Sequence, residues 1–306
     1  MRKYVLFIVL YLFGTGCESN DPDPEGESGF SNQLTAGFCI TFGDSIVINH
    51  EDIDYYDYST HIVYLKEPHP IFKDPFNLEL ANMPFSTYAF KEKIYTGIIF
   101  PAWASSIPSG TFVQWPSFLP EYLIQIEYMS PPGNLQPDTF ADPREDQRIV
   151  EALQEYEQYH PGLSLEIVDV HLTTTDRVSF TYTLTNEDSF DYYVLSPEKM
   201  GTGLFHYFTN GLYLYNQETG WLQHQVPVQT PEPWDRWKTE WLDRIDHQSS
   251  RTYYIEYEKF DQVPAGTYSL NFSFNGLSHV EKEEREHNGA LIWMGQLRIS
   301  DEIKIE

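Results

Sequence analysis

The sequence predicts a mainly β protein in which two strand-rich blocks flank one helical segment. Short runs rich in β-branched and aromatic residues recur between turn signals on both sides of residues 131–162. Within that segment, apolar residues recur at helical spacing instead. The chain has 306 residues, of which 16% are aromatic, so each block has enough apolar material for a core.

Residues 33–130 are expected to form the first β-rich domain. Strand-like runs at residues 36–42 and 61–65 are bounded by a Gly-Asp turn pair and by a Pro-His-Pro break at residues 68–70. Frequent turn residues between short strands favour an all-β arrangement over alternating strands and helices. The pattern leaves the topology of this domain unknown.

Residues 131–162 are expected to be a linker followed by a helix that connects the two blocks. Asp142 can cap the helix, and Pro143 suits its first position. Apolar residues then recur at helical spacing at Ile149, Val150, Leu153 and Tyr156. A His-Pro-Gly sequence at residues 160–162 ends the helix.

Residues 163–306 are expected to form the second β domain. In the run 178–186, one face carries apolar side chains and the other carries Ser and Thr, which is the alternation of a half-buried strand. The pair Asn210-Gly211 stands between two apolar runs and predicts a tight hairpin. This block is therefore predicted to contain many short antiparallel strands.

Two stretches of the second block resemble bacterial immunoglobulin-like domains. One is the run 178–186, which ends in an Asn turn, and the other is the run 264–270, in which a Pro/Gly corner leads to Tyr268. In that family the first stretch is a core strand and the second holds the corner tyrosine. The resemblance covers residues 163–306, implies an immunoglobulin-like β-sandwich and supplies no catalytic residue.

The start of the chain has the pattern of an export signal. A positively charged pair precedes an apolar run at residues 4–13, which is too short to cross a bilayer as a helix, since that needs about 20 residues. Small residues then lead to Cys17, an arrangement that resembles the lipobox of bacterial lipoproteins. The resemblance implies that residues 1–16 are a signal peptide and that Cys17 is acylated and holds the protein at the membrane. An ordinary secretory signal is the alternative.

Residues 17–32 are expected to be an acidic, flexible tether, because they are rich in acids, Pro, Gly and Ser. An acidic stretch directly after the lipid-carrying cysteine resembles the surface-export signal of Bacteroidetes lipoproteins. The resemblance implies an outer-membrane lipoprotein exposed at the cell surface. A polar tether without a role in export is the alternative.

The charge and the cysteine count exclude several classes of protein. With 46 acidic and 19 basic residues, the formal charge of −27 repels phosphate and excludes a nucleic-acid partner. Two cysteines exclude a disulfide-dense scaffold. If Cys17 carries lipid, Cys39 has no partner within the chain, and its apolar neighbours predict a buried, inert thiol. No cofactor is expected.

Trp234, Trp237 and Trp241 are the candidate ligand-binding residues. They stand at positions i, i+3 and i+7, which share one face if the segment is helical. A stripe of exposed rings suits the docking of a protein or the stacking of a sugar. Alternatively, the stripe packs onto its own domain.

Two segments carry metal-ligand residue types without the spacing of a metal site. His279, Glu283 and His287 would share a helical face, but the HExxH order is absent. The acids of residues 51–57 lack the glycine and the closing Glu of an EF-hand loop. A solvated loop and a polar strand end are expected instead, and no metal is assigned.

Together these patterns predict a lipid-anchored cell-envelope protein with a non-catalytic binding or structural role, whose ligand is an extracellular protein or a glycan. The nucleophile-elbow, P-loop and dinucleotide-binding patterns are absent, so no catalytic residue is assigned. One alternative is a carboxylate-dependent hydrolase of glycan or peptide. The other is an assembly partner in a surface complex.

Overall fold

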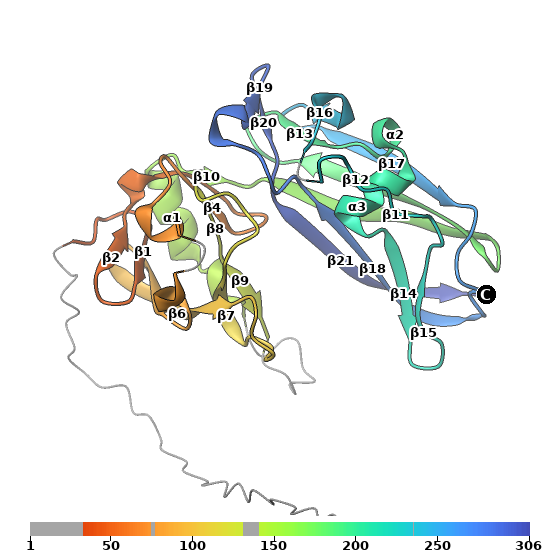
Figure 1. The fold of residues 1–306 in the computed structure, drawn as a ribbon, viewed down its shortest axis with the longest axis horizontal. Helices are drawn as coiled ribbons and strands as arrows, with labels where there is room; N and C mark the ends of the chain where they lie inside the picture. Colours follow the sequence, from red (N-terminus) through yellow and green to blue (C-terminus); the bar gives the residue numbers. More distant parts are fainter. Residues whose placement is uncertain (1–32, 75–76, 131–140, 235) are drawn as a thin grey trace, which may run out of the picture.

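The mainly β character of the protein is confirmed by its computed structural model, in which strands account for 46% and helices for 15%. The structure describes residues 33–74, 77–130, 141–234 and 236–306. In these residues the strands form five sheets, two in the first block and three in the second (Figure 1). The predicted signal peptide at residues 1–16, the lipidation of Cys17 and the tether at residues 17–32 fall outside this description.

The first block is built from two sheets around a shared core. One sheet has the strand order β2-β1-β5-β6-β7-β9, and the other has the order β10-β3-β4-β8. The strands are β1 (Cys39–Phe42), β2 (Ile46–Ile48), β3 (Ile53–Asp57), β4 (Ile62–Leu65), β5 (Pro84–Ala89), β6 (Glu92–Pro101), β7 (Gly110–Trp115), β8 (Leu123–Gln125), β9 (Glu127–Met129) and β10 (Tyr159–His160). Phe38, next to β1, contacts Tyr56 of β3 with ring centroids 5.4 Å apart, so the core lies between the two sheets.

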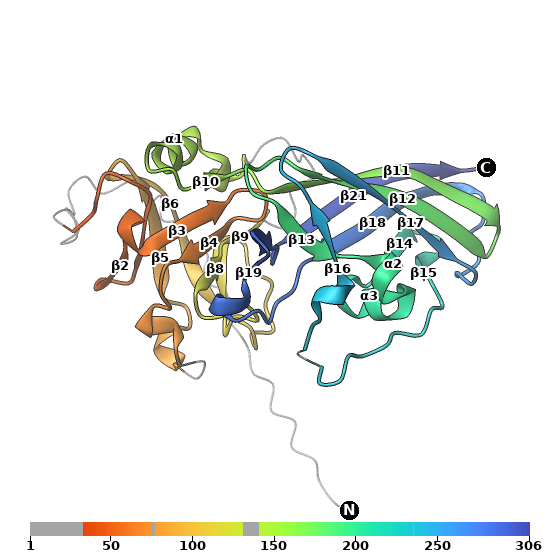
Figure 2. The ribbon, with the colours of Figure 1, turned by 90° about the horizontal axis from the view of Figure 1, so that it is seen from above.

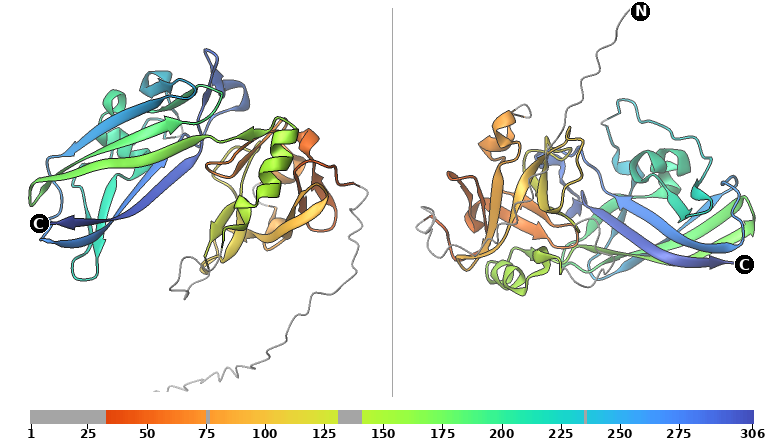
Figure 3. Two further views of the ribbon diagram at one scale, coloured as in Figure 1. Left: turned by 180° about the vertical axis from the view of Figure 1, so that it is seen from behind. Right: turned by 90° about the horizontal axis from the view of Figure 1, so that it is seen from below.

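The predicted helix exists as α1 (Gln147–Glu155), but it belongs to the first block and is not a free connector. Asp142 caps a short 3-10 turn at Pro143–Glu145, and Asp146 caps α1 itself. Ile149, Ala152 and Leu153 are buried, and α1 contacts β5 and β10 (Figure 3, left). Because β10 then pairs in parallel with β3, the first block extends through His160, within the segment 131–162 that was expected to be a linker and a connecting helix. Residues 131–140 of the predicted linker lie outside the description.

The second block contains three sheets. Their strand orders are β11-β12-β17, β15-β14-β18-β21 and β16-β13-β20-β19. The strands are β11 (Leu163–Thr174), β12 (Arg177–Asn186), β13 (Tyr192–Leu195), β14 (Leu212–Asn216), β15 (Gly220–Gln223), β16 (Leu242–Ile245), β17 (Ser250–Tyr257), β18 (Gly266–Asn275), β19 (Glu286–His287), β20 (Ala290–Ile292) and β21 (Gln296–Ile305). Two short helices, α2 (Pro197–Met200) and α3 (Thr202–Thr209), lie between β13 and β14.

The predicted alternation in β12 is confirmed, and it builds the core of the second block. Val178, Phe180, Tyr182 and Leu184 are buried. The ring of Tyr182 contacts Phe272 of β18 with centroids 5.0 Å apart, so the sheet that contains β12 packs against the sheet that contains β18. Period-two burial on both strands creates this interface.

The predicted hairpin at Asn210-Gly211 is wrong, because the residues before it form α3 and not a strand. Asn210 has a φ of 62° and caps α3, and Gly211 follows with a φ of 79°. Positive φ at an Asn-Gly pair suits a helix end as well as a hairpin turn. The burial of Phe205 and His206 on α3 decides in favour of the helix.

The prediction that residues 163–306 form an immunoglobulin-like sandwich is also wrong. Such a sandwich has two sheets, and these residues form three. In the third sheet, β13 pairs antiparallel with β16 and in parallel with β20. The alternation of apolar and polar residues indicates which side chains are buried but not which strands pair, so it did not predict this third sheet.

The third sheet of the second block leads into the junction with the first block. Trp293, just after β20, donates a hydrogen bond from Nε1 to the Asp57 carboxylate of β3, with 3.2 Å between the two atoms. The Tyr122 hydroxyl donates to the Val280 carbonyl oxygen at 2.8 Å, and Arg285 pairs with Asp54. The two blocks therefore share buried contacts. Figure 2 shows the two blocks side by side.

Among the described residues, no helix has the length and apolar character that crossing a bilayer requires.

Candidate ligand-binding cleft

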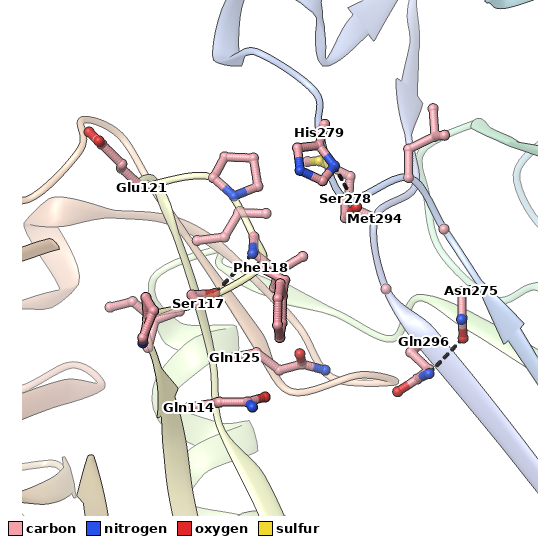
Figure 4. Close-up of a pocket in the computed structure, with 18 of the residues that line it drawn as sticks. Gln114, Ser117, Phe118, Glu121, Gln125, Asn275, Ser278, His279, Met294 and Gln296 are labelled. Atoms are coloured by element: carbon pink, nitrogen blue, oxygen red, sulfur yellow. Dashed lines mark hydrogen bonds between the residues drawn. The ribbon is translucent and has the colours of Figure 1, made fainter. Parts of the chain in front are cut away.

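A cleft with a volume of about 520 Å³ lies between the two blocks (Figure 4). This volume falls within the range of about 300–1,000 Å³ that is usual for small-molecule sites. Strands β7, β8 and β9 form the first wall. The ends of β18 and β21 and residues of α3 form the second wall.

The first wall presents two amide side chains and one exposed ring. Gln114 of β7 and Gln125 of β8 point into the open space, and their amides form no hydrogen bond to the part of the chain that the structure describes (Figure 4). Phe118, in the loop between these strands, is 73% exposed and projects between the walls. Beneath them, Trp115 is buried and donates from Nε1 to the Asn77 carbonyl oxygen at 3.2 Å.

The second wall presents amides that are held in place. Gln296 of β21 donates from Nε2 to Oδ1 of Asn275 on β18 at 2.7 Å. Asn275 donates from Nδ2 to the Phe208 carbonyl oxygen at 2.6 Å, and Arg298 donates to Oε1 of Gln296 at 2.6 Å. These bonds fix the orientation of the polar groups before a ligand arrives.

Trp234 and Trp237 complete the rim of the cleft. Trp234 is 58% exposed and meets His279 edge to face, with ring centroids 5.1 Å apart. Its backbone carbonyl oxygen accepts a hydrogen bond from the Tyr207 hydroxyl at 3.4 Å. Trp237 is partly buried against the core.

The three tryptophans singled out from the sequence do not form one helical stripe. In the long segment between β15 and β16, a single 3-10 turn at Thr239–Trp241 is the regular element, and residue 235 lies outside the description. Trp234 and Trp237 line the cleft, whereas Trp241 packs against Phe208 with Lys238 over its ring. Two of the three tryptophans therefore lie where a ligand could reach them, and the third packs onto its own domain, which was the alternative prediction.

The cleft contains two carboxylates, Glu121 and Glu127. Burial raises the pKa of Glu127, while the nearby Arg298 and Arg144 counteract that shift. The Glu121 side chain points away from the amides of Gln114 and Gln125 (Figure 4). Because Glu121 points away, Glu127 is the candidate acid for the hydrolase alternative.

The two segments with metal-ligand residue types do not gather around a common point. His279 contacts Ser278 and Trp234, whereas His287 lies in the β19–β20 hairpin. Of the acids at residues 51–57, Asp54 pairs with Arg285, and Asp57 is buried at the junction. Within the described ranges, no group of three His, Cys or acidic residues is placed to hold a metal ion.

Cys39 is buried, as its apolar neighbours predicted, and it forms no disulfide bond within the described residues. Its thiol lies 3.3 Å from Oδ1 of Asn49 and 3.2 Å from the Thr35 hydroxyl.

The sequence pattern did not single out four amide residues of the cleft: Gln114, Gln125, Asn275 and Gln296. Each is an isolated amide in a strand, which has no recognisable spacing. Phe118 had a weak signal, because it stands between Pro116 and Pro120, where a loop must hold it near the surface.

No family model matches the chain, and no curated protein matches its sequence.

Proposed function

We propose that this protein is a lipid-anchored envelope protein that binds a neutral glycan, without cleaving it, in the cleft between its two blocks. The observation that carries the proposal is that the cleft combines exposed aromatic rings with amide side chains on both walls. The amides of Gln114 and Gln125 have no hydrogen-bond partner in the described chain, whereas Asn275 and Gln296 are held by hydrogen bonds.

This combination matches the chemistry of a sugar. A pyranose ring has an apolar face that can stack on Phe118 or Trp234, because aromatic rings bury area while their edges stay polar. Its hydroxyl groups both donate and accept hydrogen bonds, and so does each amide of Gln114 and Gln125. A ligand that lacks hydroxyl groups would leave these amides unpaired.

The charge of the molecule favours a neutral glycan over an acidic one. The chain carries a formal charge of −27, which repels anions approaching from solution. Within the cleft, Glu121 and Glu127 are balanced by Arg236 and Arg298. Asn275 and Gln296 can orient the ligand at little cost in side-chain entropy, because the hydrogen bond between them already orders both side chains.

Alanine at Trp234 or at Phe118 is expected to weaken glycan binding about tenfold each, which corresponds to about 1.4 kcal/mol. The reason is the loss of a stacking face from an exposed ring, which leaves the fold intact. The measurement is calorimetric titration of the full-length protein in detergent with a neutral oligosaccharide selected on a glycan array.

Trp103→Ala is the matched control, because Trp103 is 56% exposed and lies outside the cleft. If Trp103→Ala weakens binding as much as Trp234→Ala does, the cleft is not the site. Recovery of a shortened oligosaccharide would replace the binding proposal with the hydrolase reading, with Glu127 as the first acid to test.

The membrane anchor is supported by the lipobox-like start and the acidic residues after it. Cys17→Ser is expected to abolish the incorporation of labelled fatty acid and to move the protein from the membrane fraction to the soluble fraction. Cys39→Ala is the control, because it also removes a thiol but leaves the lipobox intact. Persistent labelling of Cys17→Ser would contradict the anchor.

A further inference from the structure

The sheet β15-β14-β18-β21 has an outer face that begins at the cleft. We use outer face for the side chains that point away from the buried Leu270, Phe272 and Phe274 of β18. Asn275 and Gln296, which line the cleft, are paired across β18 and β21 and belong to this face. The face is thus a continuation of the second wall.

Three aromatic side chains gather at the other end of the outer face. Tyr215 of β14 is directly paired with Trp221 of β15, and their ring centroids are 4.8 Å apart. Tyr213, two residues earlier on β14, meets the same Trp221 edge to face at 6.4 Å. Trp221 is 63% exposed, so this aromatic platform offers rings to the solvent.

Small polar side chains lie between the platform and the cleft. Ser269, Asn271 and Ser273 alternate along β18 and are partly exposed. Ser300, paired with Asn271, lies 3.4 Å from the Ser269 hydroxyl, measured between the two Oγ atoms. These side chains are short and polar, so they can form hydrogen bonds to a ligand without obstructing it sterically.

The dimensions of the outer face fit an extended molecule. Tyr215 is paired with Ser269, and Asn275 is six residues further along β18. A strand advances about 3.4 Å per residue, so about 20 Å separate the platform from the cleft. Figure 1 shows β14, β18 and β21 side by side; β18 runs toward the cleft and its antiparallel partner β21 runs away from it.

The outer face is also nearly neutral in a strongly acidic protein. Between Asn275 and Ser269 and their partners on β21, the charged side chains of the outer face are Arg298 and Glu302, one of each sign. Asp301 also lies in this stretch of β21, but it is paired with Leu270 and so belongs to the opposite face. Neutral polar groups and exposed rings suit a sugar chain better than a charged peptide or a nucleic acid.

We propose that the glycan bound by this protein is an extended chain of neutral sugar units, which occupies the cleft and continues along the outer face to the aromatic platform. This inference rests on the proposed glycan-binding function. It makes the ligand a polysaccharide and not a free mono- or disaccharide, because a short sugar would fill the cleft and leave the platform unused.

The test compares disaccharides with hexasaccharides of the same linkage. The probes are neutral β-1,4- and α-1,4-linked gluco-, manno- and xylo-oligosaccharides, titrated calorimetrically into full-length protein in detergent. The wild type is expected to bind the best hexasaccharide at least about tenfold more tightly than its disaccharide. Trp221→Ala is expected to remove most of that gain and to leave disaccharide affinity unchanged.

Tyr254→Ala is the matched control, because Tyr254 is 55% exposed on β17, in a different sheet. Equal affinity for both lengths, or no effect of Trp221→Ala on the hexasaccharide, would overturn this inference and leave glycan binding in the cleft standing. Absence of binding at both lengths would overturn both proposals. A dimer that sedimentation detects in the wild type and not in Trp221→Ala would assign the platform to a second copy of the chain and overturn the inference.

Discussion

Replacement of Trp293 by alanine is expected to lower the free energy of unfolding by about 3–5 kcal/mol, the usual cost of deleting a buried aromatic side chain. Trp293 is fully buried where the third sheet of the second block meets the first block. Its ring stacks on Phe274 with centroids 5.7 Å apart, and its Nε1 donates to Asp57. The substitution therefore removes packing on one side and a hydrogen bond on the other.

Trp293 is tightly packed on its other side as well. A Cβ atom on Gly295 would lie 2.6 Å from the Trp293 ring and 2.4 Å from Thr60, so backbone and ring are already in close contact. Asp57 would keep its bonds to Ser59 but would lose the donor that reaches it from the second block. A buried carboxylate that loses a donor is a further cost.

Urea denaturation of Trp293→Ala, followed by circular dichroism, measures this effect. Trp293→Phe separates the two contributions, because phenylalanine keeps a ring for Phe274 but cannot donate to Asp57, and about 1–2 kcal/mol should be lost. Trp103→Ala is the control for loss of an exposed tryptophan. An unchanged midpoint for Trp293→Ala would mean that the two blocks do not stabilise each other through this contact.

Acidification from about pH 6.5 to about pH 5 is expected to destabilise the protein by about 2 kcal/mol. Burial lowers the pKa of His61 and of His206 to about 3 in the folded protein. The positive charge of Arg144 lowers the pKa of His61 further, and His224 acts likewise on His206. In the unfolded chain both histidines titrate near 6.5.

The sign follows from proton uptake. Between about pH 6.5 and about pH 5 the unfolded chain binds protons at both histidines and the folded protein does not, so stability falls by about 1.6 kcal/mol for each. Asp57 opposes this trend, because burial raises its pKa to about 6 and the folded protein takes up a proton there first. That uptake stabilises by about 1 kcal/mol over the same interval, and the two histidines outweigh it.

His206→Phe tests the assignment, because phenylalanine can stack on His224 and Tyr257 as His206 does but cannot titrate. Urea denaturation at both pH values should show that most of the loss disappears in this variant. Nε2 of His206 has no hydrogen-bond partner in the described part of the chain. Nδ1 lies 3.5 Å from the Thr209 hydroxyl, which keeps its hydrogen bond to the Phe205 carbonyl oxygen when His206 is replaced. If His206→Phe loses as much stability on acidification as the wild type, the buried histidine is not the cause.

Features that depend on neighbouring residues could be predicted from the sequence alone. The alternation of Val178, Phe180 and Tyr182 identified a half-buried strand, and apolar spacing identified α1. The apolar neighbours of Cys39 predicted its burial. Periodicity encodes which side of an element is buried, and that property is local.

Features that depend on which surfaces meet were decided by the tertiary structure. The third sheet of the second block needs β13 and β20, which are distant in sequence, to pair in parallel. The cleft needs Gln114 of the first block and Gln296 of the second to face each other. Such pairings arise from long-range packing and not from local spacing, which is why the sequence placed Trp241 with Trp234 while the fold separates them.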